Sequence, residues 1–222
     1  MKRFVVLNPN TTVAMTNAVV ARMAPLLPGA VLHGLTAPHG PPVIDSRGSF
    51  AVGAVSAVDL LGDVPAGTDA VLLACFGDPG LAEMRARCAV PVVGLAEAAI
   101  LEAVSGGRRF AIVTAGAAWV PMLRECVAGY GAAGLLVDVF ALDGNGADLR
   151  RDPAFYGAAV GGFAARALGE GAEVLILGGA AFAGLEFVLP DGVVLIDVFE
   201  AAGRRLAKVG FASHPRLGPA SR

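Results

Sequence analysis

The chain has 222 residues, of which 55% are hydrophobic and 16% charged, so it can bury a sizeable core and is not disordered. Its formal net charge is -2 and its Lys and Arg residues are scattered, which argues against a nucleic-acid partner, because such a partner needs a basic face. The longest uncharged apolar stretch, Val174–Leu185, is too short and too glycine-rich to cross a bilayer ~30 Å thick. The N-terminal apolar run stops at Asn8-Pro9-Asn10 before a signal region is complete, so we expect a cytoplasmic protein without a membrane partner.

Short β-branched runs alternate with longer Ala- and Leu-rich patterns, which predicts an α/β fold with mostly parallel sheets. The predicted strands are Phe4–Leu7, Val31–Leu35, Asp69–Ala74, Val92–Val93, Phe110–Val113, Leu135–Phe140, Val174–Leu177 and Val193–Ile196. The predicted helices are Val13–Leu27, Phe50–Gly62, Leu81–Cys88, Glu97–Val104, Ala118–Gly129, Pro153–Gly169 and Phe199–Val209. The Pro/Gly-rich segment Ala37–Pro42 and the polar segment Asp143–Asp152 are predicted to be loops.

This order of segments repeats halfway along the chain, which predicts two pseudo-symmetric α/β lobes. In open α/β sheets, ligands bind beyond the carboxyl ends of the strands, so we expect the active site in the cleft between the lobes. The expected division is residues 1–100 for the first lobe, completed by the C-terminal helix 199–209, residues 101–198 for the second lobe, and residues 210–222 as a frayed tail.

Cys75 ends a strand of the first half and is followed by the tight turn Phe76-Gly77-Asp78-Pro79-Gly80. A free cysteine is ordinarily a small buried hydrophobic residue. Here the helix from Leu81 is expected to point its positive end near the sulfur and lower the thiol pKa from about 8.5, so we favour a functional role. Cys88 and Cys126 fall in helical patterns and are predicted to be packing residues. No metal site is predicted, because the cysteines and histidines have no metal-ligand spacing.

The segments Asn8-Pro9-Asn10-Thr11 and Thr114-Ala115-Gly116 each join a strand to a helix and offer side-chain and backbone donors to an anionic or amide-like ligand. Helix capping is the alternative for both. Asp45 and Asp78 are caps or ligand contacts, and capping is the preferred interpretation. Glu186 follows a glycine-rich turn and is either a replacement acid or base or, as we prefer, a solvated carboxylate at a helix start. That turn lacks the GxGxxG pattern, so we predict no dinucleotide cofactor.

The chain resembles the Asp/Glu/hydantoin racemase superfamily, and most closely the hydantoin racemases, over nearly its whole length. The segments that carry the resemblance are Asn8–Thr11, Gly40–Asp45, Ala74–Leu81, Pro91–Ala98 and Leu177–Ala180, and the one around Cys75 is the most specific. The resemblance implies two lobes with the site between them, no cofactor, and a small-molecule carboxylate or hydantoin-like substrate. A homo-oligomer is left open, since symmetric assembly is common.

In this superfamily two cysteines face opposite sides of a carbon next to a carbonyl, and one takes a proton while the other returns one. The resemblance implies that Cys75 is the first of these cysteines. It also implies that Asn10 is a substrate-binding residue, with Thr114 as its counterpart, and that strand-end N–H groups stabilise an enediolate-like oxygen. The substrate-binding residues expected from these segments are Asn8, Asn10, Thr11, Pro41, Ile44, Phe76, Gly77, Thr114, Ala115, Gly116 and Ala180.

Gly179 stands where the superfamily has its second cysteine. The resemblance extends to the arylmalonate decarboxylases, which use one cysteine on the second lobe and have glycine on the first. A single thiol protonates a planar enediolate on one face, which suits decarboxylation or isomerisation. It suits racemisation only if Glu186 or a water supplies the second proton. We therefore favour a cofactor-independent racemase or epimerase using Cys75; the alternatives are a single-cysteine decarboxylase of 2-substituted malonates or cis-trans isomerase, and a non-catalytic small-molecule-binding protein.

Overall fold

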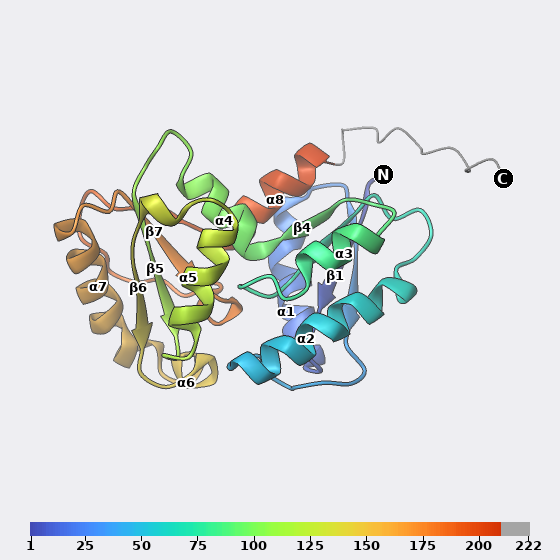
Figure 1. The fold of residues 1–222 in the computed structure, drawn as a ribbon, viewed down its shortest axis with the longest axis horizontal. Helices are drawn as coiled ribbons and strands as arrows, with labels where there is room; N and C mark the ends of the chain where they lie inside the picture. Colours follow the sequence, from blue (N-terminus) through green and yellow to red (C-terminus); the bar gives the residue numbers. More distant parts are fainter. Residues whose placement is uncertain (210–222) are drawn as a thin grey trace.

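The computed structural model describes residues 1–209, so the tail predicted at 210–222 lies outside the described residues. Two four-stranded parallel sheets lie side by side, each flanked by helices (Figure 1). The first sheet has the strand order β2-β1-β3-β4 and the second has the order β6-β5-β7-β8, so the two lobes share one connectivity. The predicted α/β class with two pseudo-symmetric lobes is confirmed.

Every predicted strand is present, and no end differs from its predicted position by more than two residues. The first sheet consists of β1 (Arg3–Asn8), β2 (Val31–Thr36), β3 (Ala70–Leu73) and β4 (Val92–Gly94), and the second of β5 (Phe110–Ala115), β6 (Leu136–Leu142), β7 (Val174–Gly178) and β8 (Val194–Ile196). The helices are α1 (Val13–Met23), α2 (Arg47–Asp59), α3 (Leu81–Arg87), α4 (Leu95–Ala103), α5 (Trp119–Gly129), α6 (Gly146–Arg151), α7 (Pro153–Gly169) and α8 (Val198–Val209). Short 3-10 turns are η1 (Ala24–Leu26), η2 (Leu60–Asp63), η3 (Ala133–Leu135) and η4 (Ala180–Phe182).

Helix α6 lies inside the segment that was predicted to be a loop, so that prediction is wrong in part. The helix has only six residues, which is too short to show a hydrophobic period. A reciprocal cap holds its start: the N–H of Asp148 donates to Asn145 Oδ1 (3.2 Å), and the N–H of Asn145 donates to Asp148 Oδ2 (3.1 Å). After β7 the chain forms only the turn η4, and Glu186 lies in irregular structure, so the prediction of a helix start there is also wrong.

The central strands β1, β3, β5 and β7 are buried on both faces, as expected for parallel sheets covered by helices. Successive residues of β1 alternate between two cores. Val5 and Leu7 face the core shared with α2 and α3, while Phe4 and Val6 face the core shared with α1, α4 and α8. This second core also includes residues of β5 and β7, so one continuous apolar interior joins the two sheets.

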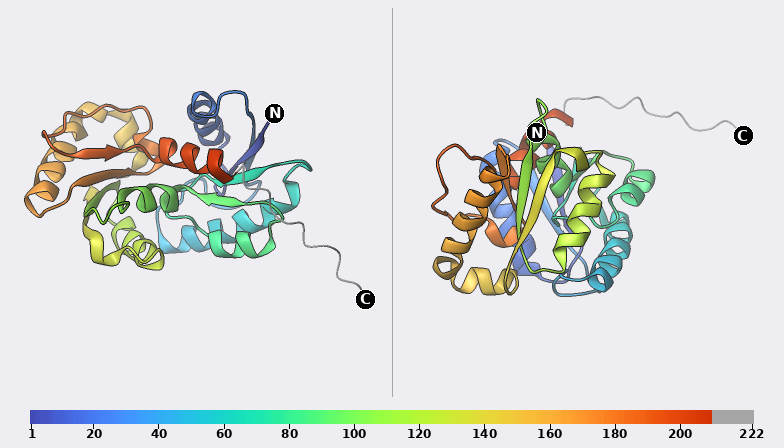
Figure 2. Two further views of the ribbon diagram at one scale, coloured as in Figure 1. Left: turned by 90° about the horizontal axis from the view of Figure 1, so that it is seen from above. Right: turned by 60° about the vertical axis from the view of Figure 1, so that its left-hand side comes forward.

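Helices α4 and α8 lie side by side where the two sheets meet (Figure 2). Most of α4 is buried on all sides, which fits its sequence of Ala, Leu and Ile with few polar residues. Helix α8 is amphipathic: Phe199, Ala202 and Leu206 are buried, and Arg204 and Lys208 point outward. Because α8 contacts both sheets, the lobe boundaries expected near residues 100 and 198 stay predictions. Within residues 1–209, no helix combines the length and the apolar character needed to span a membrane.

Candidate active site

The strand register shows that Cys75 and Gly179 occupy equivalent positions in the two lobes. In the first sheet β1 and β3 pair as far as Leu73, and in the second sheet the matching pair of β5 and β7 passes through Leu177. Cys75 lies two residues beyond Leu73, and Gly179 lies two residues beyond Leu177. The correspondence expected from the sequence repeat therefore holds residue by residue at the point where each strand ends.

The same register changes one expected correspondence. Leu7 pairs with β3 at the position where Val113 pairs with β7, so the residues that follow them, Asn8 and Thr114, are equivalent. Thr114 is thus the counterpart of Asn8 and not of Asn10.

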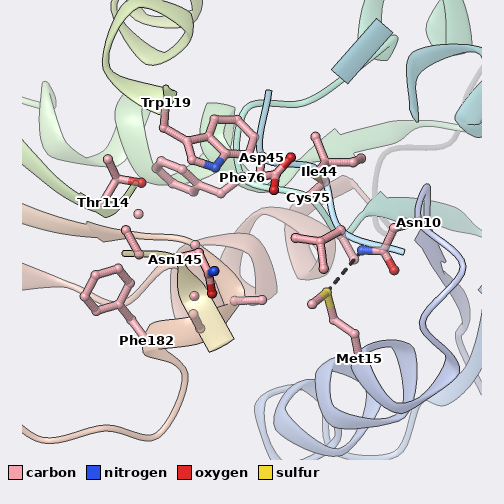
Figure 3. A pocket seen from close by; sticks show the side chains of 18 residues that line it. Asn10, Met15, Ile44, Asp45, Cys75, Phe76, Thr114, Trp119, Asn145 and Phe182 are labelled. Atoms are coloured by element: carbon pink, nitrogen blue, oxygen red, sulfur yellow. Dashed lines mark hydrogen bonds between the residues drawn. The ribbon is translucent and has the colours of Figure 1, made fainter. Parts of the chain in front are cut away.

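A cavity of about 110 Å³ lies between the lobes, at the carboxyl ends of the strands (Figure 3). The predicted site residues that line it are Asn10, Ile44, Cys75, Phe76, Thr114, Ala115, Gly179 and Ala180. The predicted site residues that do not line it are Asn8, Thr11, Pro41, Gly77 and Gly116. Side chains that sequence reasoning did not place among the substrate-binding residues also line it, chiefly Met15, Asp45, Trp119, Asn145 and Phe182.

Asn8 acts on the cavity through Asn10. Its side chain is buried and donates from Nδ2 to Asn10 Oδ1 (2.9 Å) and to Thr16 Oγ1 (3.0 Å). Asn10 Oδ1 also accepts from the N–H of Thr12 (2.9 Å), and Asn10 Nδ2 donates to Met15 Sδ (3.2 Å; Figure 3). The side chain of Asn10 is therefore held in one orientation at the cavity wall.

Two loops, one from each lobe, bring the polar residues Asp45 and Asn145 to the cavity. Asp45 precedes α2, whose start is capped by Ser46, and Asp45 Oδ1 accepts from Ser49 Oγ (3.3 Å). Asn145 precedes α6 and forms the cap described above. In Figure 3, Asn10 and Met15 lie on one side of the cavity, and Thr114, Asn145 and Phe182 lie on the other. The first pair belongs to the first lobe and the second group to the second lobe, so a ligand here touches both.

The environment of Cys75 raises its thiol pKa above the ordinary value. Burial is the main cause, followed by the negative charge of Asp78 and by the neighbouring Cys126. The residue as a whole is half-buried because it lines the cavity. The prediction that the helix from Leu81 lowers this pKa is wrong, since burial and the negative charge of Asp78 shift it in the other direction. Cys75 therefore rests as a neutral thiol.

Gly179 has a backbone conformation that residues with side chains rarely adopt, with φ 132° and ψ 153°. A Cβ atom placed on it would meet no heavy atom within 4 Å. The wall of the second lobe is thus open where the first lobe presents its thiol. The backbone at Gly179 also differs from the backbone at Cys75, which has no positive φ. Backbone and side chain therefore both depart from the pseudo-symmetry at this position.

The cavity contains little charge. Among the described residues that line it, Cys75 and Asp45 are the ones with ionisable side chains, and none is Lys, Arg or His. Glu186 does not line this cavity but an adjacent one of about 340 Å³, which shares Gly179 and Phe182 with it. Over residues 1–209, no group of three or more His, Cys, Asp or Glu residues is arranged to hold a metal ion.

Asp78 accepts hydrogen bonds at the start of a helix, but this helix is α4 and not α3, which directly follows Asp78 in the sequence. Its carboxylate accepts from the N–H groups of Ala96 (3.0 Å) and Glu97 (2.7 Å) at the start of α4. Glu97 lies in the first turn of this helix, as predicted, and is buried. It accepts two hydrogen bonds from Arg85 (2.8 and 2.6 Å), so its charge is compensated from within the first lobe.

The two matched sheets and the cysteine at their shared cavity define a two-lobed α/β protein of the racemase type. The sequence profile of the Asp/Glu/Hydantoin racemase family matches residues 5–206, and the chain belongs to this family. Two hydantoin racemases are similar to it. The one from Rhizobium meliloti is 30% identical over 97% of this chain and 95% of its own length. The one from Paenarthrobacter aurescens is 33% identical over 91% of this chain and 88% of its own length.

Solved structures show the same fold. An allantoin racemase from Klebsiella pneumoniae aligns with a TM-score of 0.82 at 29% identity, over 94% of this chain and 87% of that one. An allantoin racemase from Pseudomonas fluorescens aligns with a TM-score of 0.85 at 26% identity, over 93% and 90% of the two chains. A variant of arylmalonate decarboxylase has a TM-score of 0.62 at 15% identity, over 96% of this chain and 94% of its own, and shares the fold alone. The predicted resemblance to this superfamily is confirmed.

Proposed function

We propose that this protein is a cofactor-independent racemase or epimerase that moves a proton at a carbon next to a carbonyl, with Cys75 as the acid and base. The observation that supports it best is the place of Cys75, at the wall of a cavity between two lobes, in a chain 30–33% identical to hydantoin racemases. A thiol at that position can reach a ligand that touches both lobes.

The Cys75 thiol first loses its proton to solvent, and the thiolate then takes the proton from the carbon and becomes a thiol again. The electron pair moves onto the carbonyl oxygen, where hydrogen-bond donors at the strand ends, such as the hydroxyl of Thr114, stabilise the charge. A water molecule on the open side beside Gly179 returns a proton to the opposite face, and the hydroxide that remains takes the proton from Cys75. Because burial raises the pKa of the Cys75 thiol, we expect the rate of proton abstraction to increase with pH.

The cavity lining favours a neutral cyclic amide, such as a hydantoin with an apolar substituent. Ile44, Phe76, Trp119 and Phe182 form apolar walls. The described lining has no cationic side chain to pair with a carboxylate, and Asp45 would repel one. An Asp45 carboxylate can instead accept a hydrogen bond from a ring N–H.

A second candidate is protonation on one face only, which is the chemistry of a decarboxylase of 2-substituted malonates or a cis-trans isomerase. Two observations favour it: Gly179 offers no group to the second face, and Cys75 rests as a neutral thiol ready to donate a proton. The lack of a cationic residue in the described lining weighs against a malonate. The third candidate, a protein that binds a small molecule without changing it, needs the same cavity and no thiol chemistry.

One experiment separates these functions. The purified protein is incubated in deuterated water with single enantiomers of 5-substituted hydantoins and with 2-substituted malonates, and deuterium incorporation, chirality and carbon dioxide are measured. Racemisation with deuterium at the carbon next to the carbonyl supports the first proposal. Release of carbon dioxide with one enantiomer as product supports the decarboxylase. Measurable binding with neither reaction supports the binding protein and contradicts the proposal.

The Cys88→Ala variant is the matched control for this assay. Cys88 is also a half-buried cysteine of the first lobe, but it does not line the cavity. Its replacement should leave the rate of deuterium incorporation unchanged.

A further inference from the structure

Hydrogen bonds connect Asp78 to the backbone of Cys75 and to the start of helix α4. Its backbone N–H donates to the carbonyl oxygen of Cys75 (3.1 Å), and its carboxylate accepts the two N–H groups at the start of α4. The residue is buried and has φ 54°, the one positive φ of a non-glycine residue within residues 1–209. A left-handed conformation at such a residue costs on the order of 1 kcal/mol, so these surrounding contacts hold the turn in a strained shape.

The opposite lobe also holds this carboxylate. Tyr130 follows α5 of the second lobe, and its hydroxyl donates to Asp78 Oδ2 (2.7 Å). From the same helix, Cys126 Sγ donates to the carbonyl oxygen of Gly77 (3.8 Å). At the other end of α5, Trp119 lines the cavity and meets Phe50 of α2 edge to face, with 6.3 Å between ring centroids. Contacts from α5 of the second lobe therefore hold the turn Phe76–Gly80, which follows Cys75 in the first lobe.

The space around the carboxylate is fitted closely to it. A Cβ atom at Gly94 would lie 2.5 Å from Asp78 Oδ2, so any residue other than glycine at this position would displace the carboxylate. No Lys, Arg or His among residues 1–209 forms a direct salt bridge with this carboxylate, and the nearby Arg85 pairs with Glu97 instead. An anionic side chain is thus kept in a confined site between Cys75 and the two lobes.

We propose that Asp78 is a positioning residue for the reaction at Cys75, and that Tyr130 of the second lobe holds the Asp78 carboxylate in its working orientation. The inference rests on the proposed function of Cys75. Asp78 acts in two ways. Its hydrogen bonds fix the turn and hence the direction of the thiol. Its negative charge favours the neutral thiol, which is the form that donates a proton when the reaction runs from the opposite enantiomer.

The titratable and charged groups that face Asp78 are Cys75 on its own turn, Glu97 on α4, Arg85 on α3, and Cys126 and Tyr130 from α5. Burial raises the pKa of Asp78 to about 6, and the hydrogen bond from Tyr130 and the two N–H groups of α4 oppose this shift. Above pH 7 the carboxylate is therefore charged, and that charge raises the pKa of the Cys75 thiol further.

The test uses two full-length variants, Tyr130→Phe and Asp78→Asn. For Tyr130→Phe, kcat for deuterium incorporation into a 5-substituted hydantoin should fall at least about tenfold, because a misdirected thiol loses rate, while KM stays within about twofold. For Asp78→Asn, the pH profile of Cys75 alkylation by iodoacetamide, followed by mass spectrometry of the peptide, should shift to lower pH, because the neighbouring negative charge is gone.

The control is Tyr156→Phe, which removes a tyrosine hydroxyl from α7 of the second lobe, outside the cavity lining. A kcat in Tyr130→Phe equal to that of this control would overturn the proposal, as would an unchanged alkylation profile in folded Asp78→Asn protein. If Asp78→Asn does not fold, the Tyr130→Phe kinetics decide. If the wild-type protein turns over neither substrate class, the proposed function fails, and the alkylation profiles still test the effect of Asp78 on Cys75.

Discussion

Replacing Gly179 with cysteine tests whether the second lobe can supply the missing proton. A side chain at this position would point into open space, since a Cβ atom there meets nothing within 4 Å. The backbone resists the change, because φ 132° is a conformation that costs a non-glycine residue on the order of 1–3 kcal/mol. For a chain of this length each kcal/mol lowers Tm by about 2–4 °C, so we expect the Gly179→Cys variant to melt roughly 2–12 °C below wild type.

Gly179→Ala is the matched variant, because it carries the same backbone strain without a thiol. The comparison of the two variants therefore isolates the sulfur. We expect Gly179→Cys to racemise a 5-substituted hydantoin faster than Gly179→Ala and faster than wild type, because a second thiol can serve the face that Cys75 does not reach. Chiral chromatography of the substrate against time, at one pH and below the melting temperature of each variant, measures this rate.

Equal racemisation rates in the two folded variants would refute the reasoning, since position 179 would then have no access to the reacting carbon. The stability part is tested separately. If Gly179→Ala melts at the wild-type temperature, a side chain at this position causes no backbone strain, and the stability prediction is wrong.

Three further predictions follow from the same site. Cys75→Ala should abolish turnover and change Tm by no more than about 2 °C, since it removes one half-buried sulfur; a large loss of stability would favour a packing role. Gly94→Ala should lower both Tm and kcat, because its methyl group takes the place of the Asp78 carboxylate; wild-type kinetics would contradict the close fit. Because burial raises the pKa of Asp78 to about 6, this group stabilises the fold fully only below about pH 4, and its contribution declines as the pH rises to about 6. Urea unfolding measures this as the free energy of unfolding of wild type minus that of Asp78→Asn. Between about pH 4 and pH 6 this difference should fall by on the order of 3 kcal/mol, and a rise with pH would contradict the prediction.

The parallel sheets could be predicted from the sequence because their signal is local. The central strands are covered on both faces and therefore appear as short continuous apolar runs, such as Val174–Leu177, between Ala-rich helical patterns. The position of Cys75 at a strand end could be predicted for the same reason, and the segment around it carried the family resemblance. Helix α6 could not be predicted, because a six-residue helix held by a reciprocal cap is too short to show a hydrophobic period.

The composition of the cavity was decided by the tertiary structure. Met15, Asp45, Trp119 and Asn145 come from four separate segments, and only the packing of two lobes brings them to one cavity. The protonation state of Cys75 depends first on burial and then on the Asp78 carboxylate. The motif contains Asp78, but it does not reveal that this carboxylate and the thiol are buried together. Short-range patterns determine where strands and helices form, because those depend on neighbouring residues. Burial, access and orientation at the thiol depend on groups that are distant along the chain, such as Tyr130 and the start of α4, so only the folded arrangement decides them.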